Sequence, residues 1–331
     1  MDANHCQIEK TTIGLINQTF VVTHQALSKR YILQHLNTSI FKNPIAISAN
    51  IKFASATILA VDKEYQVIKI NQTINGEDYF IDHQNSYWRL IDFIENTTTI
   101  QSITSVGQAY QTAYSFGKFT SLLQNANTEH FIPAIPDFHN LDLRFNQFKN
   151  AYANAEDERK SQAKECIDYL LSRIEMVSIF KNIEKELLIP KRIIHADTKI
   201  SNILFDAKTL VPKAVIDWDT IMPGYFISDL GDMIRTMICK AGENETNFDN
   251  IVFRKDYYEA IISGYKDAIQ LTENELNLLS YAGKFMTYMQ ALRFLTDYLN
   301  HDVYYNISYP VHNFNRAKNH TRLLQVIEEN T

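Results

Sequence analysis

Three short apolar runs in the middle of the chain constrain its fold more than any other feature. They are RII at 192–194, ILF at 203–205 and AVI at 214–216. Short apolar runs rich in β-branched residues are typical of buried strands. Polar residues follow the first and third runs: His195, Asp197, Lys199, Asn202, Asp217 and Asp219. Because strand side chains alternate, Asp217 and Asp219 are expected to share one face. The sequence therefore predicts a polar loop held between buried strands.

The spacing of these polar residues matches the chemistry of phosphoryl transfer. Asn202 and Asp217 follow Asp197 by five and twenty residues, which is the order in which protein kinases place a catalytic aspartate and two residues that hold Mg²⁺. Magnesium prefers a few protein oxygens together with phosphate oxygens. We expect His195 to brace the loop through hydrogen bonds and Lys199 to neutralise the phosphoryl group during transfer.

The pattern of the chain changes near residue 95. Strands are predicted over 11–35, 65–70 and 87–94, and a helix that begins near Pro44 is predicted over 41–60. Helical spacing dominates the rest, over 105–124, 156–187, 273–300 and 313–329. The expected fold is α+β, with a small β-rich lobe over 1–95 and a larger, mostly helical lobe over 96–331. A cleft between two lobes is a common place for a ligand.

Composition disfavours several other classes of protein. The chain has nine glycines in 331 residues and contains neither G-x-G-x-x-G nor G-x-x-x-x-G-K-[ST], so any phosphate is bound by another route. A net charge of -6 disfavours a nucleic-acid partner. No apolar run approaches the ~20 residues of a membrane span, and no secretory signal opens the sequence. Three isolated cysteines favour a reducing cytoplasm. The oligomeric state has no signal in the sequence.

The motifs HADTKISN and VIDWDTIMPG resemble the aminoglycoside phosphotransferase and choline kinase superfamily, whose members are related to protein kinases. Within it, the chain is most similar to the N-acetylhexosamine 1-kinase group of sugar kinases. This closer resemblance rests on strings spread over nearly the whole chain: INQTFVV (16–22), KRYILQHLN (29–37), FKNP (41–44), WRL (88–90), SDLGDMIR (228–235), LRFLTDYLNHDVYY (292–305) and HNFNRA (312–317). It implies a protein-kinase-like fold and an ATP-dependent kinase of small molecules.

The resemblance also implies roles for single residues. Asp197 would be the catalytic base, and Asn202 and Asp217 would hold Mg²⁺. The hairpin from Gly14 to Phe20, with Asn17 and Thr19, would cover the phosphates of ATP. The segment DFIEN, with Phe93 and Glu95, would be the hinge that meets adenine. The residues implied for binding the sugar are Asp197, Asp219, Thr220, Arg293, Asp297 and Tyr304.

One position departs from the kinase pattern. Protein kinases place a lysine on the third strand to grip the α- and β-phosphates, whereas YILQHL offers Gln34. A neutral amide supplies no charge, so another cation such as Lys29 or Arg30 is expected to help. The nucleotide preference therefore stays open.

The favoured function is transfer of the γ-phosphoryl group of ATP to a sugar, at the anomeric hydroxyl of an N-acetylhexosamine or related hexose. A kinase for an aminoglycoside, choline or an amino alcohol is the first alternative. Residues 271–331 contain six acidic and five basic residues, a balance that favours a neutral acceptor. A pseudokinase that only binds ligands is the second alternative. The identity of the sugar and its configuration at C2 and C4 stay open.

Overall fold

The computed structural model describes residues 5–11 and 16–331. These residues pack into two compact units. The first unit comprises the described residues up to 100 together with 122–136 and 202–223, and the second comprises 101–121, 137–201 and 224–331. The fold is α+β, as expected. Because 202–223 pack with the N-terminal region, the chain passes from one unit to the other several times.

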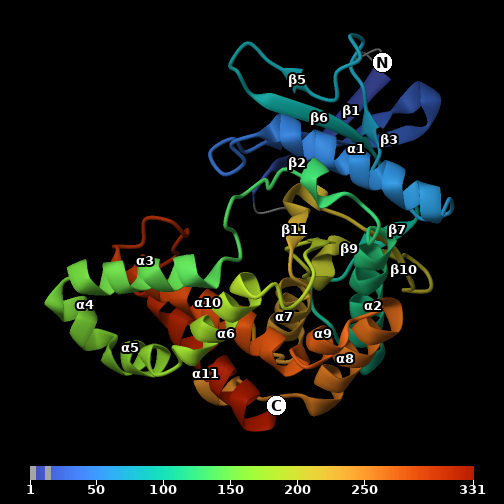
Figure 1. Ribbon diagram of the computed structural model, residues 1–331. Coiled ribbons are helices and arrows are strands. Elements are labelled where there is room, and N and C mark those ends of the chain that lie inside the picture. Colours follow the sequence, from blue (N-terminus) through green and yellow to red (C-terminus); the bar gives the residue numbers. More distant parts are fainter. Residues whose placement is uncertain (1–4, 12–15) are drawn as a thin grey trace. The chain divides into compact units, whose positions relative to one another are not determined.

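An antiparallel sheet forms the β-rich part of the first unit, with strand order β1-β2-β3-β6-β4 and β5 beside β6 (Figure 1). Its strands are β1 (Cys6–Lys10), β2 (Gln18–His24), β3 (Lys29–Leu36), β4 (Ile70–Asn71), β5 (Phe80–Ile81) and β6 (Tyr87–Asp92). Gln34 on β3 pairs with Thr19 on β2 and with Arg89 on β6. Residues paired directly across strands point to the same face, so these three side chains share one face of the sheet.

Helix α1 (Pro44–Val61) begins where the sequence predicts. The Asn43 side chain accepts a hydrogen bond from the Ala46 amide at 3.1 Å, and Pro44 suits a first helical turn because it has no amide hydrogen to leave unpaired. Among the described residues, α1 is the one helix long and apolar enough to cross a membrane. It has buried residues at helical spacing, and Asn50 donates to the Ile132 carbonyl at 2.7 Å, which is typical of a core helix.

A second sheet in the first unit has the strand order β10-β9-β7. Its strands are β7 (Thr97–Thr99), β9 (Ile203–Asp206) and β10 (Pro212–Val215). The two further strands are β8 (Arg192–Ile194) and β11 (Met222–Gly224). The three central apolar runs are therefore confirmed as strands, although the third ends at Val215.

Helices make up most of the second unit. They are α2 (Val106–Leu122), α3 (Leu141–Asn154), α4 (Asp157–Gln162), α5 (Lys164–Leu171), α6 (Glu175–Lys185), α7 (Phe226–Met237), α8 (Lys255–Ala268), α9 (Glu273–Leu276), α10 (Leu279–Leu299) and α11 (His312–Asn330). Short 3₁₀ turns cover Gln25–Leu27, Thr128–His130, Ile200–Asn202, Trp218–Thr220 and Phe248–Asn250. Helix α7 has buried residues along nearly its whole length. At Gly231 an added Cβ would lie 2.2 Å from the Ala282 carbonyl oxygen, so α7 and α10 approach closely only because this residue has no side chain.

The structure corrects several predicted elements. The region 65–70 is a strand only at its last residue, because the Ile68 carbonyl accepts from the Ser55 hydroxyl at 2.9 Å rather than from a strand. The strands predicted over 11–35 correspond to β2 and β3, and Cys6–Lys10 forms an additional strand that was not predicted. The helix α3 lies where none was predicted.

Two long predicted helices are divided. The pattern over 156–187 forms α4, α5 and α6, and the pattern over 273–300 forms α9 and α10. At the end of α5 the Leu170 carbonyl accepts a hydrogen bond from the Tyr288 hydroxyl at 2.9 Å. A contact from a distant helix thus satisfies a carbonyl at a helix end, and no local pattern of apolar residues encodes such a contact.

Candidate active site

The hairpin of β9 and β10 brings Asn202 and Asp217 to the same end. Val215 pairs with Ile203, and one step outward the Ile216 amide donates to the Asn202 carbonyl at 2.9 Å. Asn202 precedes β9 and Asp217 follows β10. The two residues therefore lie at the same end of the hairpin, although they are fifteen positions apart in the sequence. A side-chain amide and a carboxylate therefore lie at one hairpin end.

The backbone at Asp217 differs from the prediction. Its φ of 62° lies in the left-handed region, and the following residues, 218–220, form a one-turn 3₁₀ helix. The expectation that Asp217 and Asp219 alternate along a strand and share a face is therefore wrong, because the strand ends before either residue. Asp tolerates the left-handed conformation better than most residues, which suits it to this turn.

The loop around Asp197 is fixed by two carboxylates of helix α7. The His195 and Ala196 amides donate to the two oxygens of Asp229, at 2.9 and 2.8 Å. The Thr198 amide donates to Asp232 at 3.1 Å. The residues on both sides of Asp197 are thus held by buried acceptors. Asp229 is therefore a structural brace, and Arg235 forms an ion pair with Asp232 at 2.7 Å.

Burial changes the acidity of the brace. It raises the pKa of Asp229 to about 6, against the opposing effects of His195 and the two amides that bond to the carboxylate. A carboxylate accepts both amides only when it is ionised, because protonation turns one oxygen into a donor. The hydrogen bonds that hold the loop therefore depend on pH near 6, where Asp229 takes up a proton.

Asp197 pairs with Lys199 inside the same loop. The Lys199 Nζ lies 2.9 Å from a carboxylate oxygen of Asp197, and both side chains are about one-third exposed. His195 is fully buried and lies edge-on to the rings of Phe116 and Phe119. Its buried place among aromatic rings favours a packing role within the loop, and bracing through hydrogen bonds of its side chain stays a prediction.

Asp219 lies in a buried network that sequence reasoning missed. Its carboxylate forms an ion pair with Arg89 at 2.5 Å and accepts from the Asn17 side chain at 2.7 Å. Arg89 in turn donates from Nε and Nη2 to the Gln34 amide oxygen, at 2.8 and 2.7 Å. Gln34 donates weakly to Thr19 at 3.5 Å. Asn17, which was predicted to bind nucleotide, therefore bonds directly to a carboxylate that was predicted to bind sugar. Gln34 and Thr19, also predicted to bind nucleotide, connect to the same carboxylate through Arg89, which the sequence had not singled out.

The cations expected to replace the third-strand lysine lie elsewhere. Arg30 forms an ion pair with Glu95 and stacks over the Phe93 ring, so these two predicted hinge residues hold an arginine. Lys29 is exposed and lies on the opposite side of β3 from Gln34. The cation beside Gln34 is Arg89, which corrects the expectation for Lys29 and Arg30. Gly14 lies outside the described residues.

Arg293 is the centre of a cluster in the second unit. Its guanidinium lies 5.4 Å from the centre of the Phe138 ring and 6.0 and 5.5 Å from those of Tyr304 and Tyr305, and its Nη1 donates to the Gln290 side chain at 3.1 Å. No carboxylate of the described residues forms an ion pair with Arg293. Aromatic rings beside a cation and a planar set of donors are a surface suited to a polar, hydroxyl-rich ligand.

Arg144 and His139 extend this cluster toward Asp197. Burial, and then the charge of Arg293, lower the pKa of the Arg144 guanidinium. Burial and the same two arginines lower the pKa of His139 to about 3, and the Asp197 carboxylate acts in the opposite direction. The Nδ1 of His139 is buried and has no hydrogen-bond partner among the described residues. His139 thus senses the charges of both arginines and of Asp197 and stays neutral.

Two other residues predicted to contact the sugar are buried. Asp297 accepts from the Tyr304 and Tyr305 amides at 2.8 and 2.9 Å and from the Asn313 side chain at 2.9 Å. These contacts favour positioning of the tyrosine loop over a direct contact with an acceptor. Thr220 lies in the 3₁₀ turn of the first unit.

Comparison with known proteins decides the family. The chain matches the APH phosphotransferase enzyme family over residues 8–249. The chain belongs to this family. It is therefore a phosphotransferase that acts on small molecules, and the match covers the predicted loop, the β9–β10 hairpin and the Arg89 network.

Solved structures with the same fold align with this phosphotransferase over nearly its whole length. An aminoglycoside phosphotransferase from Alicyclobacillus acidocaldarius has a TM-score of 0.66 at 12% identity, over 99% of this chain and 93% of that chain. A microcompartment-associated aminopropanol kinase has a TM-score of 0.62 at 15% identity, again over 99% and 93%. An amicoumacin kinase, solved with AMP-PNP and Ca²⁺, has a TM-score of 0.58 at 13% identity, over 100% and 90%. At these identities the likeness establishes the protein-kinase-like fold.

The donor set of the phosphotransferase fits a metal that a nucleotide brings with it. In the part of the chain that the structure describes, no three His, Cys, Asp or Glu residues cluster in a way that could hold a metal ion. The amide of Asn202 and the carboxylate of Asp217 fit the small number of protein ligands that Mg²⁺ takes beside phosphate oxygens and water.

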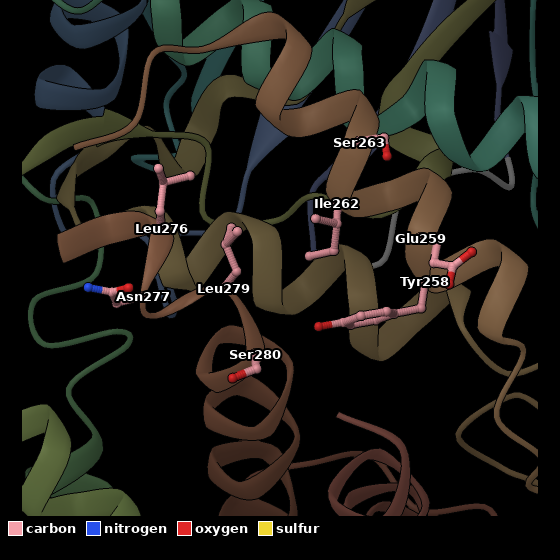
Figure 2. Close-up of a pocket in the computed structure, with 8 residues that line it drawn as sticks. All are labelled: Tyr258, Glu259, Ile262, Ser263, Leu276, Asn277, Leu279 and Ser280. Atoms are coloured by element: carbon pink, nitrogen blue, oxygen red, sulfur yellow. The ribbon is translucent and has the colours of Figure 1, made fainter. Parts of the chain in front are cut away.

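A separate hollow of about 370 Å³ lies between α8 and the start of α10 (Figure 2). The residues that line it are Tyr258, Glu259, Ile262, Ser263, Leu276, Asn277, Leu279 and Ser280. None of the predicted site residues is among them, so this hollow has no part in the proposed chemistry.

Proposed function

We propose that this phosphotransferase transfers the γ-phosphoryl group of ATP to a hydroxyl of a neutral sugar, at the anomeric position of an N-acetylhexosamine or related hexose. Asp197 orients the acceptor hydroxyl and takes its proton as the oxygen attacks phosphorus. The braced loop keeps this carboxylate in one place, and catalysis of phosphoryl transfer depends mainly on such positioning and on charge compensation.

Asn202 and Asp217 are the residues that would hold Mg²⁺. The ion, when bound, offsets negative charge on the phosphates. Lys199 pairs with the Asp197 carboxylate, and we propose that its ammonium group offsets charge on the γ-phosphoryl group during transfer. Nucleotide contacts are proposed for Asn17, Thr19, Gln34, Phe93 and Glu95, and Asp219 and Thr220 are proposed to support the acceptor.

The pair formed by Arg144 and Arg293 is the observation that most favours a neutral acceptor. Arg144 and Arg293 repel each other, and among the described residues neither forms an ion pair with a carboxylate; their side-chain partners are Gln147 and Gln290. A polycationic aminoglycoside or a choline-like ammonium would add positive charge to this cluster. Sugar hydroxyls and an acetamido carbonyl can instead accept hydrogen bonds from the guanidinium groups. The cluster thus supports the sugar over the cationic alternatives.

The test is a panel of acceptors with ATP and Mg²⁺, followed by ADP release. We expect turnover with one or more of N-acetylglucosamine, N-acetylgalactosamine, glucose and galactose, and none with choline, ethanolamine or kanamycin. The methyl glycoside of the accepted sugar is the matched control, because it lacks only the free anomeric hydroxyl. Turnover of that glycoside would overturn the anomeric assignment, and turnover of a cationic acceptor alone would overturn the sugar. Nucleotide binding without turnover of any acceptor would favour the pseudokinase.

An arginine substitution separates acceptor binding from chemistry. Replacing Arg293 with Gln removes the charge and leaves hydrogen-bonding atoms. Losing one charged hydrogen bond of ~1.5–3 kcal/mol should raise the acceptor KM by roughly 10- to 100-fold, with the KM for ATP unchanged. An unchanged acceptor KM would remove Arg293 from the site.

A further inference from the structure

Arg89 occupies the face of the sheet that carries Gln34, the residue in the place of the phosphate-gripping lysine. The two residues pair directly across β3 and β6, and two hydrogen bonds join their side chains. A cation therefore reaches the Gln34 position from the neighbouring strand. The side chain of Arg89 is 3% exposed, so its charge is held in a nearly dry environment.

One part of this arginine is left without a partner. Nε and Nη2 bond to Gln34 and Asp219, whereas Nη1 is buried and has no hydrogen-bond partner among the described residues. A buried donor without an acceptor costs ~1–3 kcal/mol, and a charged one costs more. A ligand or water that supplies an acceptor would remove this cost, and phosphate oxygens are strong acceptors for a guanidinium.

Arg89 is held by a carboxylate, as the third-strand lysine of protein kinases is, but by a different residue. In protein kinases the third-strand lysine binds the α- and β-phosphates and is held by a glutamate. Here a carboxylate, Asp219, holds the arginine at 2.5 Å with 2% of its side chain exposed. Asn17, in the hairpin predicted to cover the phosphates, donates to the same carboxylate. The cation, its carboxylate and the predicted phosphate hairpin thus form one connected network.

We propose that Arg89 replaces the third-strand lysine and binds the α- and β-phosphates of the nucleotide through Nη1. This inference rests on the proposed use of ATP, but it is independent of which acceptor the enzyme takes. Gln34 orients the guanidinium and contributes no charge. The alternative cation on β3, Arg30, lies four residues away, about 13 Å along the strand, and is paired with Glu95.

Equilibrium binding of nucleotides without any acceptor tests this role. The affinities for ADP and for adenosine are compared, because only ADP has the phosphates, and a partial loss of folded protein affects both equally. For Arg89→Gln we expect the ratio of ADP to adenosine affinity to fall by roughly 10- to 100-fold, the value of one or two charged hydrogen bonds. Arg30→Gln, in an exposed pair on the same sheet, should leave the ratio unchanged.

A double variant distinguishes phosphate binding from a structural role. Gln34→Lys combined with Arg89→Gln returns the cation to the third strand and should restore much of the lost ratio, which a residue needed only to hold Asp219 would not allow. An unchanged ratio in Arg89→Gln, or a loss in Arg30→Gln, would overturn the proposal. Arg30→Gln removes an exposed ion pair and the stacking on Phe93, and a loss of the ratio in this variant would overturn the proposal even if the buried arginine cannot be replaced in a folded protein. Nucleotide binding by variants of this set is measurable whether or not the sugar assignment holds.

Discussion

The Ala196 amide donates to the Asp229 carboxylate at 2.8 Å, one residue before Asp197 in the chain. Asp229 belongs to helix α7, which is buried along most of its length, and a second carboxylate of that helix holds the amide of Thr198. The loop of the proposed catalytic base is therefore held by the buried helix α7 of the second unit through two carboxylates.

Asp197→Asn should abolish most of the turnover and keep the fold. The amide can still lie in the braced loop but cannot accept the proton of the acceptor hydroxyl, so kcat should fall by roughly 10²–10⁴-fold, the usual contribution of a general base. Steady-state kinetics together with the thermal midpoint check this. Lys199→Met is the companion variant, since it removes only the partner of the carboxylate. Near-normal turnover in Asp197→Asn would reject the assignment of the base.

Activity should fall with pH below about 6, through Asp229. The pKa of this carboxyl is about 6 in the folded chain and 3.8 as the ordinary value, so the folded protein takes up the proton first. Protonation costs one of the two amide hydrogen bonds and loosens the loop, and kcat declines. Between pH 6 and 4 the folded state binds this proton and the unfolded state does not. Asp229 therefore increases the free energy of unfolding as the pH falls through this range.

The Asp229→Asn variant separates these two effects. It has no titrating group, so the acidic limb of the kcat profile should flatten, at a kcat already lowered by ~10-fold or more because an amide nitrogen cannot accept from a backbone amide. Profiles of kcat and of urea midpoints between pH 4.5 and 8 provide the measurement. A limb that persists unchanged in the variant would assign it to another group.

His320 should make the protein sensitive to acid. Burial and the charge of Arg235 lower its pKa to about 3, while its ring bonds to the Arg316 carbonyl at 3.0 Å and to Arg235 at 3.3 Å as a neutral imidazole. The unfolded chain binds a proton below pH ~6.5 and the folded chain does not, so stability falls with pH by up to ~1.4 kcal/mol per unit below that value. In His320→Gln, urea unfolding at pH 7, 6 and 5 should show a shallower decline, and an equal slope would contradict the prediction.

Gly231→Ala should destabilise the second unit by about 1–3 kcal/mol, the usual cost of overpacking a core. The new methyl group would lie 2.2 Å from the Ala282 carbonyl oxygen, which forces α7 away from α10. Gly242→Ala is the matched control, because an added Cβ there has nothing within 4 Å. Urea unfolding of both variants gives the comparison. Equal midpoints would show that the two helices separate without cost.

The sequence was informative where chemistry and local pattern coincide. The buried strands around the polar loop and α1 with Pro44 in its first turn were both predictable from residue type and spacing. The division of 156–187 into separate helices was not, because a distant tyrosine hydroxyl stabilises the break. The register that places Arg89 opposite Gln34 was also beyond reach, since β3 and β6 are separated by fifty residues and cross-strand pairing is non-local.

Single residues show the same limit at the site. Asp219 was predicted to contact the acceptor. Its ion pair with Arg89 depends instead on how the turn after β10 meets another sheet. A signal was present in the sequence, since WRL places an arginine in the middle of an otherwise apolar strand, and a buried cation requires a partner. Arg144 and His139 gave no such signal, because they flank the start of a helix that was not predicted.

The close contact of α7 with α10 has a consequence for engineering this enzyme. The carboxylates that hold the base come from α7, whereas the arginines and aromatic rings near it come from α3, α10 and the segments that adjoin them. Randomising residues 138–144 and 304–305 should therefore yield libraries with altered acceptor choice and intact chemistry. Libraries built on α7 should instead be dominated by inactive clones, because Gly231 and the two aspartates leave that helix almost no freedom to vary.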